Sequence, residues 1–207
     1  MTRGRSACLR PHVPVPSELR TAHLLLRPWR PDDAARLLPV LEENHAHLAP
    51  WIPARVADPA PLPALEQRLA EFAADFAAAR EWRYAMLAPD GDAVLGEVGL
   101  YPRAAAGRVP YADADHVEIG YWLRADATGR GLASEATRAA LDVAVALPRL
   151  ARAEIRCDVR NAASAAVPRR LGFALDRTIE VAALAPAEPP IALQVWTHPL
   201  HRASLDA

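Results

Sequence analysis

The chain has 207 residues, of which 52% are apolar and 24% charged, and its 24 basic and 25 acidic groups give a formal net charge of -1. This composition favours one globular domain with a buried core and excludes disorder as the main state. Because there is neither net positive charge nor a basic run, we expect no nucleic-acid partner. No apolar run approaches the roughly 20 residues that cross a bilayer, so no membrane partner is expected either.

Cysteine and histidine usage restricts the compartment and the chemistry. Cys8 and Cys157 are too few for a disulfide scaffold, and neither has zinc-site spacing. The first residues lack the apolar core of a signal peptide. A cytoplasmic protein therefore fits best. His45 and His47 lack a third ligand nearby, so no metal site is predicted.

The first half of the chain predicts a strand followed by two helices. Three prolines between residues 11 and 16 indicate a flexible tail over residues 1–17. A strand is predicted over residues 19–27, and a helix begins at Pro31, where proline and two acids are typical of a helix start. Five prolines between residues 49 and 63 favour a loop, and helical spacing resumes over residues 64–80.

The second half predicts six strands and two more helices. Residues 82–87 and 94–101 form a hairpin pattern, and residues 115–124 form a longer strand that places Glu118 and Trp122 on one face. A helix over residues 132–147, a strand over 152–159, a helix from Asn161 to Gly172 and strands over 173–181 and 191–197 follow. The order indicates a mixed sheet flanked by helices.

A loop with two glycines precedes the helix at residue 132. Gly129 and Gly131 would let the backbone approach a ligand closely, and the helix after them points unpaired N–H groups at that place. A pyrophosphate fits such a loop, and a simple turn is the alternative. The dinucleotide-binding fingerprint is excluded because Ser134 stands where its third glycine belongs, and a Walker loop is excluded because the chain has no lysine.

Three ordered blocks carry a resemblance to a known family: LLLRPWRPDDA, EIGYWLRADATGRGLASEA and RCDVRNAASAAVPRRLGF. From about Thr21 to Pro199 the chain resembles the GCN5-related N-acetyltransferases (GNAT), in their RimJ/RimL-like branch. The resemblance implies one α/β domain over residues 18–200 with a short tail at 201–207. It also implies a mixed, mostly antiparallel sheet of about six or seven strands, about four flanking helices, and a splay between the fourth and fifth strands.

The resemblance further implies an enzyme that transfers an acetyl group from acetyl-CoA to a primary amine by direct attack, with no metal. The amine belongs to a protein or peptide N-terminus or to a small molecule. A homodimer stays open. The family's phosphate-binding pattern, Q/R-x-x-G-x-G/A, has Thr in place of Gln or Arg at its first position. It falls on Thr128, Gly129, Arg130, Gly131, Leu132 and Ala133.

The same resemblance assigns the catalytic roles. A backbone N–H near Trp122 or Leu123 would stabilise the oxyanion. Glu118 is the first choice for the base that deprotonates the amine, and Glu180 is the second. Ser164 would donate to the leaving thiolate, while Asn161 would hold amides of the cosubstrate.

Each assignment has a structural alternative. Glu118 could instead pair with Arg124 or His116, Glu180 could be a surface residue, and Ser164 could serve only the N-terminus of its helix. Pro168 removes an amide that would bond the Ser164 carbonyl, so a kink is expected near the proposed acid.

The acceptor side and the overall activity also leave alternatives. Trp51, in a loop, is the predicted acceptor-binding residue. A second function, favoured by Thr128 and Pro168, is a non-catalytic acyl-CoA sensor of the same fold. Within the enzyme class, a donor with a longer acyl chain stays open.

Overall fold

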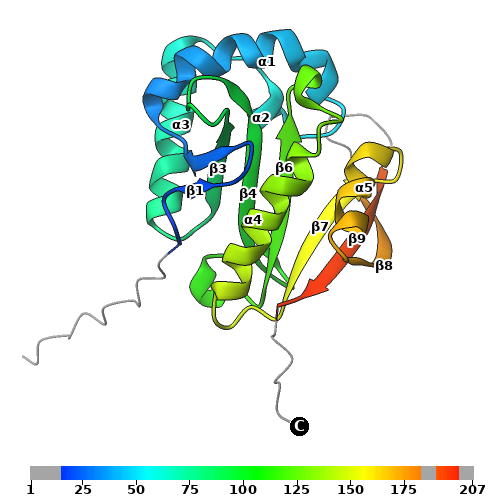
Figure 1. Ribbon diagram of the computed structural model, residues 1–207. Helices are drawn as coiled ribbons and strands as arrows, with labels where there is room; N and C mark the ends of the chain where they lie inside the picture. Colours follow the sequence, from blue (N-terminus) through cyan, green and yellow to red (C-terminus); the bar gives the residue numbers. More distant parts are fainter. Residues whose placement is uncertain (1–14, 183–189, 201–207) are drawn as a thin grey trace, which may run out of the picture.

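The computed structural model describes residues 15–182 and 190–200, in which the strands form one sheet in the order β1-β2-β3-β4-β6-β7-β9-β8, with β5 paired to β4 (Figure 1). The strands are β1 (Leu19–Arg20), β2 (Leu25–Pro28), β3 (Trp82–Leu87), β4 (Val94–Ala104), β5 (Gly107–Arg108), β6 (His116–Leu123), β7 (Arg152–Asp158), β8 (Ala174–Val181) and β9 (Ile191–Pro199). The helices are α1 (Ala34–Leu48), α2 (Ala54–Ala57), α3 (Leu62–Ala77), α4 (Leu132–Ala146) and α5 (Ala162–Arg170). Of the strand pairs described, β6 with β7 is parallel and the others are antiparallel.

Helices cover both faces of this sheet, so each face has its own core. Leu132, Leu141 and other buried residues of α4 pack with Val117 and Ile119 of β6, and α4 crosses in front of the sheet in Figure 1. On the opposite face, α1 and α3 pack against β2, β3 and Trp122. The predicted alternation along β6 is therefore confirmed. Val117 and Ile119 belong to the core under α4, whereas Trp122 belongs to the core under α1 and α3.

The predicted order of elements and the mixed, mostly antiparallel sheet are confirmed, and the differences are local. The sheet is 9-stranded because β1 and β5, of two residues each, add to the predicted set. The strand predicted over residues 19–27 is broken into β1 and β2 by a turn in which the Thr21 amide donates to the Leu24 carbonyl at 3.0 Å. The proline-rich loop contains the single-turn helix α2.

The packed chain begins earlier than predicted. Val15 packs against the core, and the Tyr84 hydroxyl donates to the Pro16 carbonyl at 2.8 Å, so residues 15–17 are held although a tail was predicted there. The remainder of that tail, the C-terminal tail and Cys8 lie outside the described residues.

A buried ion pair explains the first sequence block. Asp33 is fully buried before α1, and Arg27 of β2 donates to both of its carboxylate oxygens at 2.6 Å. The Arg30 amide adds a bond of 2.9 Å, and Arg36 contacts the same carboxylate. Because each oxygen has a charged partner, the desolvation of Asp33 is offset and the start of α1 is fixed to β2.

We expect this carboxylate to make the fold sensitive to acid. Burial alone would raise the pKa of Asp33, but the bonds from Arg27 and Arg30 outweigh it and lower that pKa. A lowered folded-state pKa stabilises the fold above the unfolded value of about 3.9, and this contribution is lost as pH falls through the folded value. Urea unfolding from pH 7 to pH 3 should show the free energy of unfolding falling below about pH 4.

The matched control for that titration is the neighbouring carboxylate. Asp33→Asn should flatten the fall in acid, whereas Asp32→Asn, at an exposed position, should keep it. An equally steep fall in the Asp33 variant would assign the acid sensitivity to other groups.

Of the residues that the structure describes, none belongs to a helix long and apolar enough to span a bilayer.

Candidate active site

A splay between two parallel strands opens the site. β6 and β7 pair only at three positions, from His116 with Arg152 to Glu118 with Glu154. Beyond them β6 stays paired with β4 as far as Leu123, while β7 follows β9 as far as Asp158. Figure 1 shows the two strands meeting at one end and diverging toward the other. The predicted splay is thus present, and a cavity of about 1230 Å³ extends from it.

The register of β6 decides which amide faces the gap. The Arg124 amide donates to the Leu95 carbonyl of the β4 side at 2.9 Å. Amides alternate between the two neighbours of a strand, so the Trp122 amide also faces β4 and the Leu123 amide faces the gap. Of the two predicted oxyanion donors, the geometry favours Leu123.

The two-glycine loop lies between β6 and α4 with its backbone accessible. Gly129 and Gly131 have φ angles of +73° and +81°, and a Cβ at either would meet no atom within 4 Å. Gly131 is the N-cap of α4, and its carbonyl accepts from the Glu135 amide. The amides before Glu135 in the first turn have no acceptor within the helix, so they are available to a ligand. The loop can therefore receive a diphosphate.

The other residues of the phosphate-binding pattern differ in position. Thr128, Leu132 and Ala133 line the cavity, whereas the exposed Arg130 is not among its lining residues. The Thr128 hydroxyl donates to the Ala125 carbonyl at 2.7 Å, so this side chain serves the turn.

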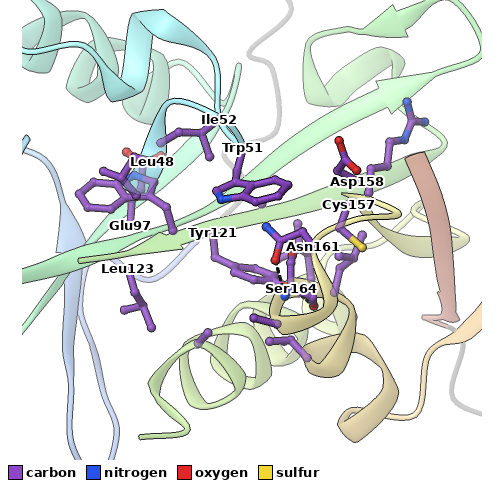
Figure 2. Close-up of a pocket in the computed structure, with 18 of the residues that line it drawn as sticks. Leu48, Trp51, Ile52, Glu97, Tyr121, Leu123, Cys157, Asp158, Asn161 and Ser164 are labelled. Carbon is purple, nitrogen blue, oxygen red and sulfur yellow. Dashed lines mark hydrogen bonds between the residues drawn. The ribbon is translucent and has the colours of Figure 1, made fainter. Parts of the chain in front are cut away.

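The second helix N-terminus at the splay belongs to α5, which follows β7. Asn161 is its N-cap, and its Oδ1 accepts from the Ser164 amide at 2.9 Å, the dashed contact in Figure 2. Asn161, not Ser164, therefore caps this helix. Both side chains line the cavity. The structural alternative for Ser164, service to the helix N-terminus through its side chain, is not what the structure shows.

Ser164 is held from across the splay by a residue that the sequence analysis did not select. The Tyr121 hydroxyl donates to the Ser164 carbonyl at 2.9 Å and lies 3.2 Å from the Ser164 hydroxyl. Alternation along the strand places Tyr121 on the face opposite Glu118 and Trp122. Its half-buried position beside a helix that contains a proline could not be anticipated from alternation.

Cys157 of β7 is buried, and so is Ile155 on the same face of the strand. Burial raises the pKa of the Cys157 thiol, so the neutral form is favoured. Val159, the last residue of the predicted strand, is 45% exposed because it lies beyond the end of β7.

Glu118 is engaged in ion pairs at the closed end of the splay. Its Oε2 lies 2.6 Å from Arg103 Nε and 3.3 Å from Arg156 Nε, and these partners replace the Arg124 and His116 pairing considered from sequence. Glu118 also precedes Leu123 by five strand residues, about 16 Å at about 3.3 Å per residue. Glu118 lines the same cavity as Leu123, and at this separation a base role for Glu118 would require intervening water.

Glu180 does not join the other predicted residues. It is exposed on β8, where it pairs with Ala192, and the lining of the cavity includes its neighbour Val181 but not Glu180. β8 is an edge strand of the sheet, and adjacent residues of a strand face opposite sides. Val181 therefore faces the cavity, and Glu180 faces away from it.

Two buried acids in the cavity wall, Asp158 and Glu97, were not predicted, because no motif in the sequence singles out either of them. Asp158 accepts from the Arg160 guanidinium at 2.6 and 2.9 Å, and those bonds lower the pKa of Asp158. Glu97 accepts from the Trp29 indole at 2.7 Å and from Arg83 at 2.8 Å. With their oxygens occupied, both acids shape the wall.

Trp51 stands at the mouth of the cavity, between α1 and α2. It is 38% exposed, and Figure 2 shows its ring on the same side of the cavity as Ile52, facing Tyr121 and Asn161. The Arg160 guanidinium lies 6.0 Å from the ring centre. An exposed aromatic side chain at the entrance provides an apolar surface for a second ligand.

Comparison with known proteins agrees with this geometry. The family described as Acetyltransferase (GNAT) domain matches residues 23–174. YdaF of Bacillus subtilis (strain 168), named as a candidate ribosomal N-acetyltransferase, is 28% identical over 161 residues, 73% of this chain and 78% of YdaF.

Two solved structures have the same fold. The self-immunity acetyltransferase MccE, in complex with acetyl-CoA and AMP, has a TM-score of 0.75 and 17% identity, with 89% of this chain and 97% of that chain covered. RimJ of Mycobacterium smegmatis, in complex with a CoA-disulfide, has a TM-score of 0.70 and 22% identity, with 85% and 81% covered.

The chain belongs to the GNAT family of acetyltransferases. It is an acyltransferase that uses acetyl-CoA as cosubstrate and transfers acetyl to an amine. The two-glycine loop, the splayed strands and the N-terminus of α5 all line the same cavity.

Proposed function

We propose that this enzyme acetylates the terminal α-amine of a protein or peptide, with ribosomal proteins as the first candidates. The observation that carries the proposal is the cavity, whose 1230 Å³ exceeds the roughly 300–1,000 Å³ of ordinary ligand pockets. It extends from the donor side of the splay to Trp51, so it has room for a thioester and a chain end together. The name of YdaF supports the choice of ribosomal proteins. A cytoplasmic location is part of the proposal, because ribosomes and acetyl-CoA occur there.

The proposed mechanism uses backbone and hydroxyl groups of the two sides of the splay. The amides of Gly131 and the first turn of α4 bind the diphosphate, and Asn161 holds amides of the pantetheine arm. The Leu123 amide points at the thioester oxygen and stabilises the negative charge that develops on it. Ser164 then donates to the sulfur as the C–S bond breaks. The amine loses its proton to solvent or to a carboxylate through water.

The test is a coupled assay of thiol release and product mass. Purified enzyme with acetyl-CoA is offered three acceptor groups: peptides with a free N-terminus, the same peptides with a blocked N-terminus, and small amines such as free amino acids and polyamines. We expect thiol release and a mass gain of one acetyl group on free-terminus peptides only. Faster turnover of small amines would replace the proposed acceptor. Coenzyme A binding without release on any acceptor would favour the sensor, and a preference for longer acyl donors would change the donor.

A further inference from the structure

Pro168 removes one backbone hydrogen bond from the interior of α5. The helix runs from Ala162 to Arg170 with this proline inside it. In an α-helix the amide of residue 168 would bond the carbonyl of residue 164, and proline has no N–H to donate. The carbonyl of Ser164 therefore loses its partner within the helix, although the helix continues for two residues beyond the proline.

Tyr121 supplies the missing donor from the other side of the splay. Its hydroxyl donates to that carbonyl at 2.9 Å. Burial raises the pKa of the Tyr121 phenol, so it stays protonated and able to donate at neutral pH. A side chain of β6 thus bonds a carbonyl of α5, the helix that follows the diverging strand β7.

The same hydroxyl also sets the orientation of the Ser164 side chain. The two hydroxyl oxygens lie 3.2 Å apart. Because the phenol proton is committed to the carbonyl, the phenol oxygen is left to accept from Ser164. The Ser164 side chain also interacts with the Cys157 thiol, and all three residues line the cavity. With its amide bonded to Asn161, Ser164 is fixed at its amide, carbonyl and hydroxyl groups.

We propose that Pro168 and Tyr121 act as a pair that positions Ser164 for the leaving thiolate: the proline frees the serine carbonyl, and the tyrosine binds that carbonyl and orients the serine hydroxyl. Tyr121 is then a positioning residue, and Ser164 is the group that touches the substrate. This inference rests on the proposed function for its catalytic half only.

The step itself balances without a further reactant. The amine nitrogen forms the new bond to the acetyl carbon, the C–S bond breaks, and its electron pair goes to sulfur. A thiolate is a charged acceptor and a stronger one than a phenol oxygen, so the Ser164 O–H rotates from Tyr121 to sulfur. The bond from Tyr121 to the Ser164 carbonyl keeps the serine oxygen in place during this rotation. The proton that the amine loses equals the one that the thiolate gains, and Ser164 is restored from solvent.

The structural half is tested by a stability cycle that needs no activity. Tyr121→Phe should lower Tm by about 2–4 °C when residue 168 is proline, because the carbonyl loses its donor. In Pro168→Ala the helix supplies an amide, so the same tyrosine change should lower Tm by less than about 1 °C. Equal shifts in the two backgrounds would overturn the pairing of Pro168 with Tyr121.

Tyr84 provides the matched control. Its hydroxyl also donates to a backbone carbonyl, that of Pro16, at 2.8 Å, far from the splay in sequence and outside the cavity lining. Tyr84→Phe should lower Tm equally with proline or alanine at residue 168, and kcat should stay at the wild-type value in both.

The catalytic half is tested by a kinetic cycle with Ser164. Tyr121→Phe should lower kcat about tenfold while KM for acetyl-CoA changes by less than about twofold, because misplacement of a reacting group acts on turnover. Added to Ser164→Ala, the same change should lower kcat by less than about twofold further, because Tyr121 acts through the serine. A full tenfold loss in the serine variant would show that Tyr121 acts independently and would refute the positioning role.

Failure of the proposed function gives a different result. If the wild-type protein acetylates none of the acceptors, the proposed function and the catalytic half of this inference both fall. The stability cycle still decides whether Pro168 and Tyr121 are coupled.

Discussion

Replacing Gly131 with tryptophan should weaken coenzyme A binding by about 100-fold or more. The residue has φ +81° and open space around its Cβ position, so an indole there would occupy the place where a diphosphate meets the loop. Loss of two hydrogen bonds to a charged group, each about 1.5–3 kcal/mol, is enough for that factor. Isothermal titration with coenzyme A measures it.

The control for this variant separates blocking from backbone strain. A tryptophan at positive φ also strains the loop by about 1–2 kcal/mol, and asparagine tolerates that conformation better than other residues with a side chain. Gly131→Asn should therefore keep the affinity within about threefold of wild type. If the asparagine variant loses binding as fully as the tryptophan variant, strain and not access explains the result. If neither loses binding, the diphosphate lies elsewhere.

The second large effect is expected from Ser164→Ala, which should lower kcat about 100-fold, the lower range for loss of a general acid. The helix should persist, because Asn161 caps it through the Ser164 backbone amide, which alanine retains. Affinity for coenzyme A should change by less than about twofold, since the hydroxyl acts mainly as charge develops on sulfur. Initial rates at saturating acetyl-CoA give kcat, and titration calorimetry gives the affinity.

Ser164→Thr tests whether the hydroxyl is what matters. It keeps the hydroxyl and should recover most of the lost turnover, although the added methyl group narrows the rotamer choice. Unchanged turnover in the alanine variant would remove Ser164 from the mechanism and leave direct release of the thiolate to solvent.

The two features that favoured a non-catalytic sensor have structural explanations. Thr128 replaces the usual Gln or Arg, yet its hydroxyl bonds the Ala125 carbonyl and the backbone of the loop remains open. Pro168 leaves a carbonyl without its helical partner, and Tyr121 bonds it. Neither departure closes the cavity or removes the amides that the donor requires.

Much of the fold could be predicted from local pattern because periodicity and punctuation are local. The 3.6-residue repeats of α3 and α4, the alternation of β6 and the glycine after α5 each reflect forces between near neighbours in sequence. The predictions that failed involve the same limit. The break at Thr21 arises where the chain turns so that β1 pairs with β2. The partners of Glu118 are Arg103 of β4 and Arg156 of β7, which are distant in sequence.

Within the candidate site, the sequence could locate the glycine loop, but it could not show which groups of the neighbouring strands face the cavity. The choice of Leu123 over Trp122 depends on the register with β4, which is set by an amide 29 residues away from its acceptor. The exposure of Glu180 depends on β8 being an edge strand. The contact of Tyr121 with Ser164 follows only from the tertiary structure, which places β6 beside α5.

The sequence by itself determined the family, the order of helices and strands, and the glycine loop before α4, because these depend on residue identity and short-range spacing. Only the tertiary structure decided which amide faces the splay, which carboxylates are already paired, and that Tyr121 reaches Ser164. The Arg103–Glu118 ion pair and the Tyr121–Ser164 bond join residues that are 15 and 43 positions apart, so they depend on how the whole sheet packs against helices on both faces.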